Sequence, residues 1–145
     1  MSFNPIFSLF RSIYLSLTGR IQFPRNRIGE IITAHDGMQF IIFRQVIVGS
    51  AKGQPCKPGA RFQVRFRITR MTPKQNEIFS LVPILFITGL PEFRSKLWMN
   101  DRSEGWCQGL YEWETVQAAE KYANSFAMRF MTKRAEPGSI SYRIN

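Results

Sequence analysis

The sequence predicts an α+β fold built on an antiparallel sheet, and three observations lead to this prediction. Strict alternation of apolar and polar side chains marks most of the expected strands after residue 60. Two segments between these strands carry apolar residues at helical spacing. The chain has 145 residues, of which 44% are hydrophobic, and this is enough for one domain with a core of its own.

The first of these strands, over 61–70, carries an apolar face and a strongly cationic face. Phe62, Val64, Phe66 and Ile68 alternate with Arg61, Gln63, Arg65 and Arg67. The next two strands are predicted over 93–100 and 106–114, with polar turn residues between them, and a last strand over 139–144. In the strand over 93–100, Phe93, Leu97 and Met99 alternate against Arg94, Lys96 and Trp98.

The spacing of apolar residues predicts one helix over 73–82, ended or kinked by Pro83. A second and longer helix is predicted after Thr115, its expected N-cap, and runs to Arg134. The resulting order is β-α-β-β-α-β, which is typical of a ferredoxin-like sheet with two helices on one face. We therefore predict a ferredoxin-like domain over residues 60–145.

Residues 1–59 are expected to form an N-terminal extension. A helix is predicted over 3–17, followed by a β-hairpin over 28–48 whose turn contains His35, Asp36 and Gly37. A turn-rich linker that includes Cys56 covers 49–59. We assign no catalytic role to His35, because the adjacent Asp36 is poorly placed to orient it from the next position in a turn.

The excess positive charge lies entirely in the first half of the chain. Residues 1–75 contain 12 Lys and Arg against 2 Asp and Glu, whereas residues 76–145 contain 8 of each class. The net charge of +10 indicates an anionic partner, which is a nucleic acid, a lipid surface or an acidic small molecule.

Two interpretations of the predicted N-terminal helix stay open. The helix either lies on a membrane surface, with Arg11, Arg20, Arg25 and Arg27 near anionic headgroups, or docks on its own domain or a partner chain. The longest apolar stretch, over 78–90, is interrupted by polar residues and is too short to span a bilayer. No basic residue precedes the N-terminal apolar stretch, so we expect no signal peptide and a cytoplasmic protein, with peripheral membrane contact as the alternative.

The function is expected on the sheet face that carries no helices. Alternation places the following side chains there: Arg61, Arg65, Arg67, Arg94, Lys96, Trp98, Glu112, Ser141 and Arg143. The apolar side chains of the opposite parity are expected to face the two helices.

Several segments of the second half resemble the YdhR-like monooxygenases of the dimeric α+β barrel superfamily, over about residues 62–144. The resemblance lies in Leu90-Pro91-Glu92-Phe93, Lys96-Leu97-Trp98, Gly109-Leu110-Tyr111-Glu112-Trp113 and Ala119-Glu120-Lys121-Tyr122. It implies a homodimer with its sheets face to face, and in some members the oxygenation of aromatic substrates without metal or flavin. Those oxygenases use an Asn, Trp and Tyr set; Trp98, Tyr111 and Trp113 are available here, and Asn76 is the nearest asparagine in type. Haem-degrading members rely on a histidine, and His35 lies outside the matching region.

A ligand site is therefore expected between aromatic walls and cationic side chains. Trp98, Tyr111 and Trp113 would stack on an aromatic or acidic ligand; Arg65, Arg67 and Lys96 would hold its carboxylate or phenolate, with Glu112 as counter-charge or base. We assign no catalytic residue and expect no cofactor, since two cysteines and one histidine cannot form a four-ligand zinc site without several carboxylates.

Two other interpretations of the same residues remain. In the first, the arginines pair with Glu112 at a dimer interface, without any ligand. In the second, the protein binds nucleic acid, because a ferredoxin-like sheet with aromatics on its open face is also the RNA-recognition design. Glu112 and Glu114 on the third strand would repel phosphate, which makes this the weaker alternative.

Overall fold

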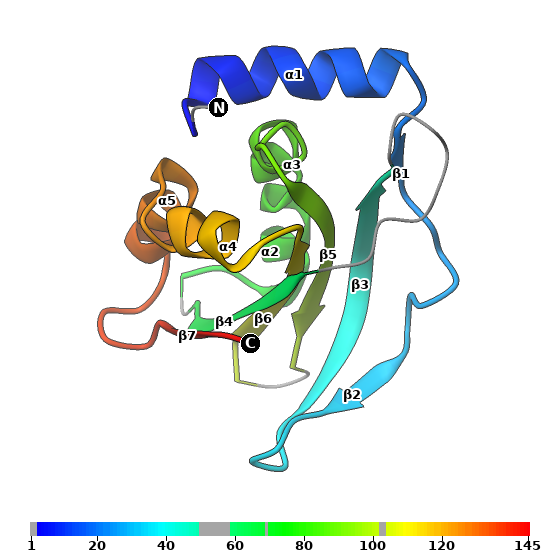
Figure 1. Cartoon of the computed structure of the whole chain (residues 1–145). Helices are drawn as coiled ribbons and strands as arrows, with labels where there is room; N and C mark the ends of the chain where they lie inside the picture. The colour runs from blue at the N-terminus through cyan, green and yellow to red at the C-terminus, as the bar shows by residue number, and fades with distance from the viewer. Residues whose placement is uncertain (1–2, 50–58, 69, 102–103) are drawn as a thin grey trace.

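The structure, a computed structural model, describes residues 3–49, 59–68, 70–101 and 104–145 and contains one antiparallel seven-stranded sheet with its helices on one face (Figure 1). The strands are β1 (Ile21–Gln22), β2 (Ile31–Thr33), β3 (Gln39–Val48), β4 (Ala60–Arg67), β5 (Phe93–Asn100), β6 (Trp106–Trp113) and β7 (Ser141–Ile144). The helices are α1 (Pro5–Leu17), α2 (Pro73–Phe79), α3 (Leu81–Ile87), α4 (Val116–Ala123) and α5 (Phe126–Arg134). The strand order is β1-β3-β5-β6-β4-β7, and β2 pairs with β3.

The predicted ferredoxin-like fold is confirmed. β4, the α2–α3 pair, β5, β6, the α4–α5 pair and β7 follow one another along the chain in the expected β-α-β-β-α-β order. The alternation in β4 has the expected effect, since Phe62, Val64 and Phe66 are buried in the core under the helices. The arginines of this strand lie on the opposite side of the sheet.

Both predicted helices of this unit are in fact pairs of shorter helices. As predicted, the first helix is interrupted near Pro83: α2 ends at Phe79, whose carbonyl cannot receive a hydrogen bond from a proline four residues later. Pro83 itself lies in the first turn of α3, where a missing backbone N–H costs no hydrogen bond. The second predicted helix is interrupted at Asn124 and Ser125, and α5 begins at Phe126 in a new direction. The amide of Asn124 bonds back to the Glu120 carbonyl and helps to end α4.

The N-terminal segment adds to the same sheet. β3 pairs with β5, and α1 packs on α3. The predicted hairpin is present, with Gly37 in the left-handed conformation that its turn requires (φ 86°). The hairpin tip reaches across the helix-free face, where Asp36 pairs with Arg65 of β4. The predicted linker and Cys56 fall largely on residues 50–58, outside the described residues.

The buried side chains form a cluster on each side of the sheet. The larger one lies between the sheet and the helices and includes Tyr111, Trp113 and Tyr122. The smaller one, on the helix-free face, consists of Phe40, Ile42, Leu97 and Met99. In the part of the chain that the structure describes, no helix combines the length and the apolar character needed to cross a bilayer.

Candidate functional site

A β-bulge near the start of β5 decides which side chains reach the site. Phe93 pairs with Trp113, but the next paired residue is Ser95, opposite Glu112, so Arg94 is the extra residue. One extra residue exchanges the two faces of the strand beyond it. Lys96 and Trp98 therefore point toward the helices, and our prediction that they share the helix-free face with Arg65 is wrong. In the sequence, Ser95 occupies the position between Phe93 and Leu97 where the alternation calls for an apolar residue, and this is the only sign of the bulge there.

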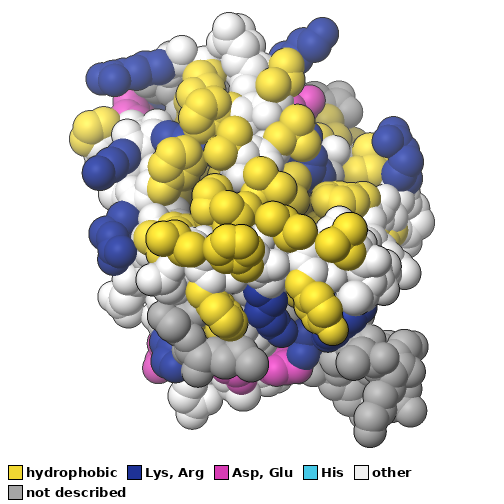
Figure 2. All heavy atoms as spheres, turned by 90° about the horizontal axis from the view of Figure 1, so that it is seen from above, with side chains coloured by type: hydrophobic (Ala, Val, Ile, Leu, Met, Phe, Trp, Pro, Cys, Tyr) yellow, Lys and Arg dark blue, Asp and Glu magenta, His cyan; other side chains and the backbone are white. Residues whose placement is uncertain are grey.

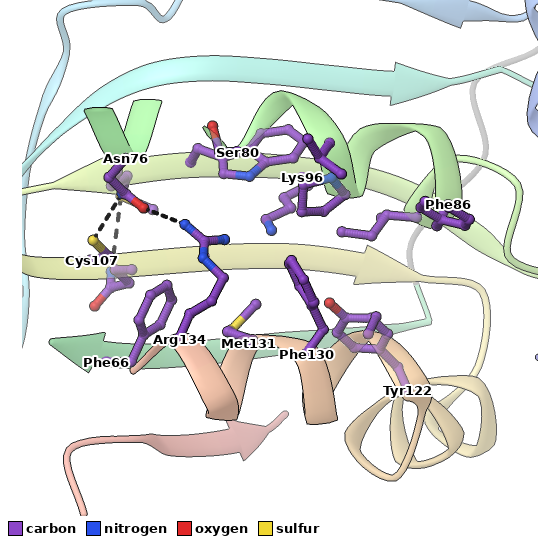
Figure 3. A pocket seen from close by; sticks show the side chains of 18 of the residues that line it. Phe66, Asn76, Ser80, Phe86, Lys96, Cys107, Tyr122, Phe130, Met131 and Arg134 are labelled. Carbon is purple, nitrogen blue, oxygen red and sulfur yellow. Dashed lines mark hydrogen bonds between the residues drawn. The ribbon is translucent and has the colours of Figure 1, made fainter. Parts of the chain in front are cut away.

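The reversal places Lys96 and Trp98 in a cavity of about 250 Å³ between β5, β6 and the helices α3 and α5 (Figure 3). Most of its lining is apolar and includes Phe66, Val82, Phe86, Phe126, Phe130 and Met131. Concave apolar cavities with a few polar groups are the usual form of a small-molecule site. The cavity is therefore the candidate functional site of this chain.

The most unusual group in the cavity is the Lys96 ammonium. The residue is only 3% exposed, and among the described residues no hydrogen bond or ion pair to it is found. Its nearest aromatic neighbours are the rings of Trp98, at 4.4 Å from Nζ to the centroid, and Tyr111, at 4.3 Å. Burial lowers the pKa of Lys96 well below its usual value, and the charges of Arg134 and Arg44 lower it further.

Gly109, opposite Trp98 on β6, makes room for the lysine side chain. A Cβ atom at this position would stand 3.3 Å from Cε of Lys96 and 2.9 Å from Cε1 of Tyr111. The aliphatic part of Lys96 therefore lies over β6 at Gly109, where this strand has no side chain.

Two arginines lie near enough to the lysine to act on its charge. Arg44 of β3 donates hydrogen bonds to the Glu77 carbonyl (3.0 Å) and to the Ser80 hydroxyl. Arg134 of α5 donates to Oδ1 of Asn76 at 2.8 Å. Burial lowers the pKa of both arginines, which nevertheless remain cations at neutral pH.

The remaining polar groups of the site stay neutral. Asn76 donates to Sγ of Cys107 at 3.2 Å, and burial raises the pKa of this thiol to about 12. The Tyr122 hydroxyl donates to that of Tyr111 at 2.9 Å, and burial raises the pKa of both tyrosines. No Asp or Glu belongs to the described lining of the cavity. An apolar cavity bordered by cations without a carboxylate favours an anionic guest.

The structure brings together three of the seven residues predicted for the site. Lys96 and Trp98 line the cavity, and Tyr111 contacts both the lysine and Tyr122. Trp113 is fully buried in the core next to Phe93 and does not line the cavity.

Arg65, Arg67 and Glu112 lie on the other face of the sheet and have partners there. Arg65 pairs with Asp36 and also donates to Oε1 of Gln108. Glu112 accepts a hydrogen bond from Ser95 at 2.7 Å. Arg67 lies 3.8 Å from a carboxylate oxygen of Glu136 and donates to the carbonyl of Glu104. These three residues do not belong to the cavity.

Arg44, Arg134, Cys107 and Tyr122 were missed by sequence reasoning as site residues. The helical spacing of Tyr122 indicated only that it faces the sheet. Arg44 and Arg134 come from elements 90 residues apart in the sequence, and no local pattern links them. Asn76, noted only as the nearest asparagine, lines the same cavity as Trp98 and Tyr122.

The comparisons with known proteins fit this architecture. No family model and no curated protein matches the sequence, but solved structures do. An uncharacterised ferredoxin-fold protein from Listeria monocytogenes, related to antibiotic biosynthesis monooxygenases, matches with a TM-score of 0.56 and 12% identity, over 74% of this chain and 63% of that one. A monooxygenase-like protein from Listeria innocua matches with a TM-score of 0.55 and 11% identity, over 76% and 64%.

A haem-degrading enzyme from Listeria monocytogenes matches with a TM-score of 0.53 and 13% identity, over 77% of this chain and 72% of that one. The chain thus spans less than two thirds of the length of the first two proteins. At these identities the likeness concerns the fold. The chain has the ferredoxin-like α+β fold that is also found in monooxygenase-like and haem-degrading proteins.

Proposed function

We propose that the cavity binds an apolar small molecule with an acidic group, which it holds as a phenolate, enolate or carboxylate. The observation that carries this proposal is the buried Lys96 ammonium, which faces aromatic rings and has no anionic partner among the described residues. An unpaired buried charge is costly, so a ligand anion beside Lys96 recovers free energy that the empty site lacks.

Cofactor-independent oxygenation of such a ligand is the reaction that this arrangement supports best. Asn76, Trp98 and Tyr122 border one cavity, and they are of the three residue types expected from the resemblance to the YdhR-like monooxygenases. The lowered pKa of Lys96 makes its neutral amine accessible as a base, and an arriving acid protonates this amine to the ammonium that then pairs with the ligand anion. One solved structure of the same fold, with a TM-score of 0.51 and 16% identity, is described as an anthrone oxidase-like protein.

In the proposed reaction, the Lys96 amine removes a proton from a CH₂ group next to a carbonyl or an aromatic ring. The resulting ammonium stabilises the enolate oxygen, with Arg44 and Arg134 adding positive potential. The carbanion carbon donates electrons to dioxygen and forms a C–O bond, which gives a peroxide that takes up the proton from Lys96. Loss of water from this hydroperoxide leaves a C=O group, so that CH₂ and O₂ become C=O and H₂O.

Haem degradation is not supported by the residues of this chain. Its single histidine, His35, lies at the tip of the β2–β3 hairpin, next to the residue that pairs with Arg65 on the other side of the sheet. The cavity therefore contains no imidazole to ligate a haem iron. Among the described residues there is also no group of three His, Cys, Asp or Glu side chains that could hold a metal ion.

Nucleic-acid binding through the sheet is the less favoured candidate. Trp98, Tyr111 and Trp113 are buried beneath the helices and cannot stack on bases. A homodimer through the helix-free face stays a proposal that the resemblance suggests. Sedimentation equilibrium would test it, and a monomer at high protein concentration would contradict it.

Fluorescence titration with anthracene-9-carboxylate and with its neutral analogue, anthracene-9-methanol, would test ligand binding. We expect the carboxylate to bind at least about tenfold more tightly, since a charge-assisted hydrogen bond contributes about 1.5–3 kcal/mol. Lys96→Met should abolish this preference, whereas the matched control Arg65→Met, on the other face, should keep it. Equal affinity of the wild-type protein for both probes would contradict the proposed ligand class.

Anthrone and dioxygen would test the reaction. The expected outcome is oxygen consumption with formation of anthraquinone, lost in Lys96→Met and kept in Arg65→Met. Binding of the carboxylate without any oxygen uptake would leave the binding proposal in place and reject the oxygenase step for this substrate.

A further inference from the structure

Helix α1 leaves most of its apolar side chains exposed, although Leu15 is buried in the core. The side that packs against the domain includes two serines, since Ser8 is 0% and Ser12 4% exposed. The opposite side is apolar and faces outward, with Ile6 67%, Phe10 68% and Leu17 83% exposed. A surface helix of a globular domain normally buries its apolar side.

Close packing of α1 on the end of α3 explains the small residues on its inner side. A Cβ atom at Gly89 would lie 1.7 Å from the Ser8 carbonyl oxygen, so the two backbones approach more closely than any larger residue permits. The Ser12 and Thr88 hydroxyls share a hydrogen bond of 2.7 Å in the same contact. The serines therefore make a specific contact, and this docking leaves the apolar side of α1 exposed.

The apolar side of α1 continues across α3. Figure 2, which views the molecule from above α1, shows hydrophobic side chains gathered into one broad area with Lys and Arg around it. We call this area the outer apolar surface and define it by Ile6, Phe10 and Leu17 of α1 with Leu81, Val82 and Leu85 of α3. The three residues of α3 are each about half exposed. Contiguous apolar areas of this kind mark interaction sites.

The charge around the outer apolar surface selects its partner. Arg11 of α1 and Arg20 just after it are the only charged residues of 1–22. Exposed Lys74 of α2, and Arg129 and Lys133 of α5, add cations on the neighbouring helices. An apolar centre with a basic rim matches an anionic bilayer, whose headgroups attract the rim while its acyl chains receive the apolar side chains. A second copy of this chain would instead place one basic rim against another.

The cavity opens at the edge of this surface. Val82 and Phe130 line the cavity and are also 49% and 39% exposed, and Pro5 at the start of α1 belongs to the same lining. We infer that the outer apolar surface docks on an anionic lipid bilayer and turns the cavity mouth toward the membrane, so that the ligand enters from the lipid phase. The docking is inferred from α1, α3 and the cations near them, whereas the entry of the ligand from the lipid phase rests on the proposed function.

Vesicle flotation would test the docking. We expect the wild-type protein to float with vesicles of phosphatidylcholine and phosphatidylglycerol and to stay unbound with phosphatidylcholine alone. Phe10→Ser combined with Leu17→Ser should weaken binding at least about tenfold, because two apolar side chains no longer enter the bilayer. The matched control is Ile31→Ser, an exposed apolar residue of β2 at the opposite end of the molecule, and it should bind as the wild type does (Figure 1).

A Phe10→Trp variant provides a direct readout, since its emission should shift to the blue on anionic vesicles and be quenched by brominated lipids. Absence of wild-type binding, or an equal loss in Ile31→Ser, would overturn the inference. So would a wild-type dimer that the double serine variant dissociates without any vesicle binding, because the surface would then be an interface between copies.

Two variants separate this inference from the proposed function. The double serine variant should keep its affinity for anthracene-9-carboxylate in buffer without vesicles, since neither residue lines the cavity. Lys96→Met should lose that affinity and still float with anionic vesicles. Failure of flotation alone would reject the docking and leave the ligand site standing.

Discussion

The two faces of the sheet differ in whether their cations have anionic partners. On the helix-free face, Arg65 is held by Asp36 and Gln108 near solvent. On the helix-covered face, Lys96 is 3% exposed and faces two aromatic rings, with Arg44 and Arg134 nearby. Both faces are rich in positive charge, but only one has its charge balanced within the chain.

This difference separates charge that serves the fold from charge available to a ligand. A cation with a carboxylate partner on the surface contributes little to stability and has no need of a ligand. A buried cation without one lowers the stability of the empty protein, and such a cost is typical of functional sites. The predictions below test this contrast, from the largest expected effect to the smallest.

Lys96→Met should stabilise the ligand-free protein by about 1–3 kcal/mol at neutral pH, because it replaces a buried amine, whose protonation burial opposes, by an apolar side chain of similar length. Because the pKa of Lys96 is lowered in the folded state, the unfolded chain binds more protons between that pKa and the usual value of 10.5. The wild-type protein should therefore become more stable relative to the variant as pH rises through this window, so the difference between their free energies of unfolding should shrink.

Urea denaturation of both proteins over a pH series would measure the difference. For Arg65→Met, the difference in free energy of unfolding from wild type should not shrink over the same pH range. A Lys96→Met protein less stable than wild type at every pH would contradict the description of this ammonium as an unbalanced charge.

Gly109→Ala should destabilise the fold by about 1–3 kcal/mol, since its methyl group would lie 2.9 Å from the Tyr111 ring and 3.3 Å from Lys96. It should also weaken binding of anthracene-9-carboxylate, because the lysine must move. Thermal denaturation and fluorescence titration would check the two effects. Gly29→Ala is a useful comparison, since Gly29 has open space around it and only its positive φ opposes the change. Unchanged ligand affinity in Gly109→Ala would show that the lysine position does not depend on this glycine.

Tyr122→Phe should cost about 1–2 kcal/mol, because the buried Tyr111 hydroxyl loses its partner. The raised pKa of both tyrosines predicts that neither ionises below about pH 10 in the folded protein. The absorbance of tyrosinate, recorded during a pH titration, would measure the ionisation of these tyrosines. Exposed Tyr142→Phe is the control, and an equal loss of stability in both variants would argue against the buried hydroxyl pair.

Asp36→Asn on the helix-free face should have the smallest effect, and none on ligand affinity. Arg65 lowers the pKa of Asp36 in the folded state, so any stability from this pair is present above the ordinary carboxyl pKa and is lost as pH falls. Denaturation at neutral and acid pH, with and without added salt, would detect it. A loss of ligand binding in Asp36→Asn would show that the two faces of the sheet are coupled and do not act separately.

Local pattern was sufficient for most of the strands of this protein. Alternation in β4 identified the strand and its buried face, because a strand's side chains alternate whatever its neighbours are, and β6 lies within the strand predicted over 106–114. Proline and capping signals also located helix boundaries, since α2 ends four residues before Pro83 and Thr115 caps α4. They did not show that a separate helix, α3, begins at Leu81 with Pro83 in its first turn, because this depends on how α3 packs.

What the sequence determined by itself was the α+β class, the β-α-β-β-α-β order and the presence of unbalanced positive charge, since these follow from periodicity and composition. Only the tertiary structure decided where that charge serves a site. One bulge residue, Arg94, moved Lys96 and Trp98 to the opposite face, where the pairing of β3 with β5 brings Arg44 near Lys96 and the packing of α5 brings Arg134 into the cavity lining. A bulge depends on the pairing of two strands, and burial depends on the packing of distant elements, so the neighbouring residues carry at most a weak sign of either, such as Ser95 among the apolar positions of β5.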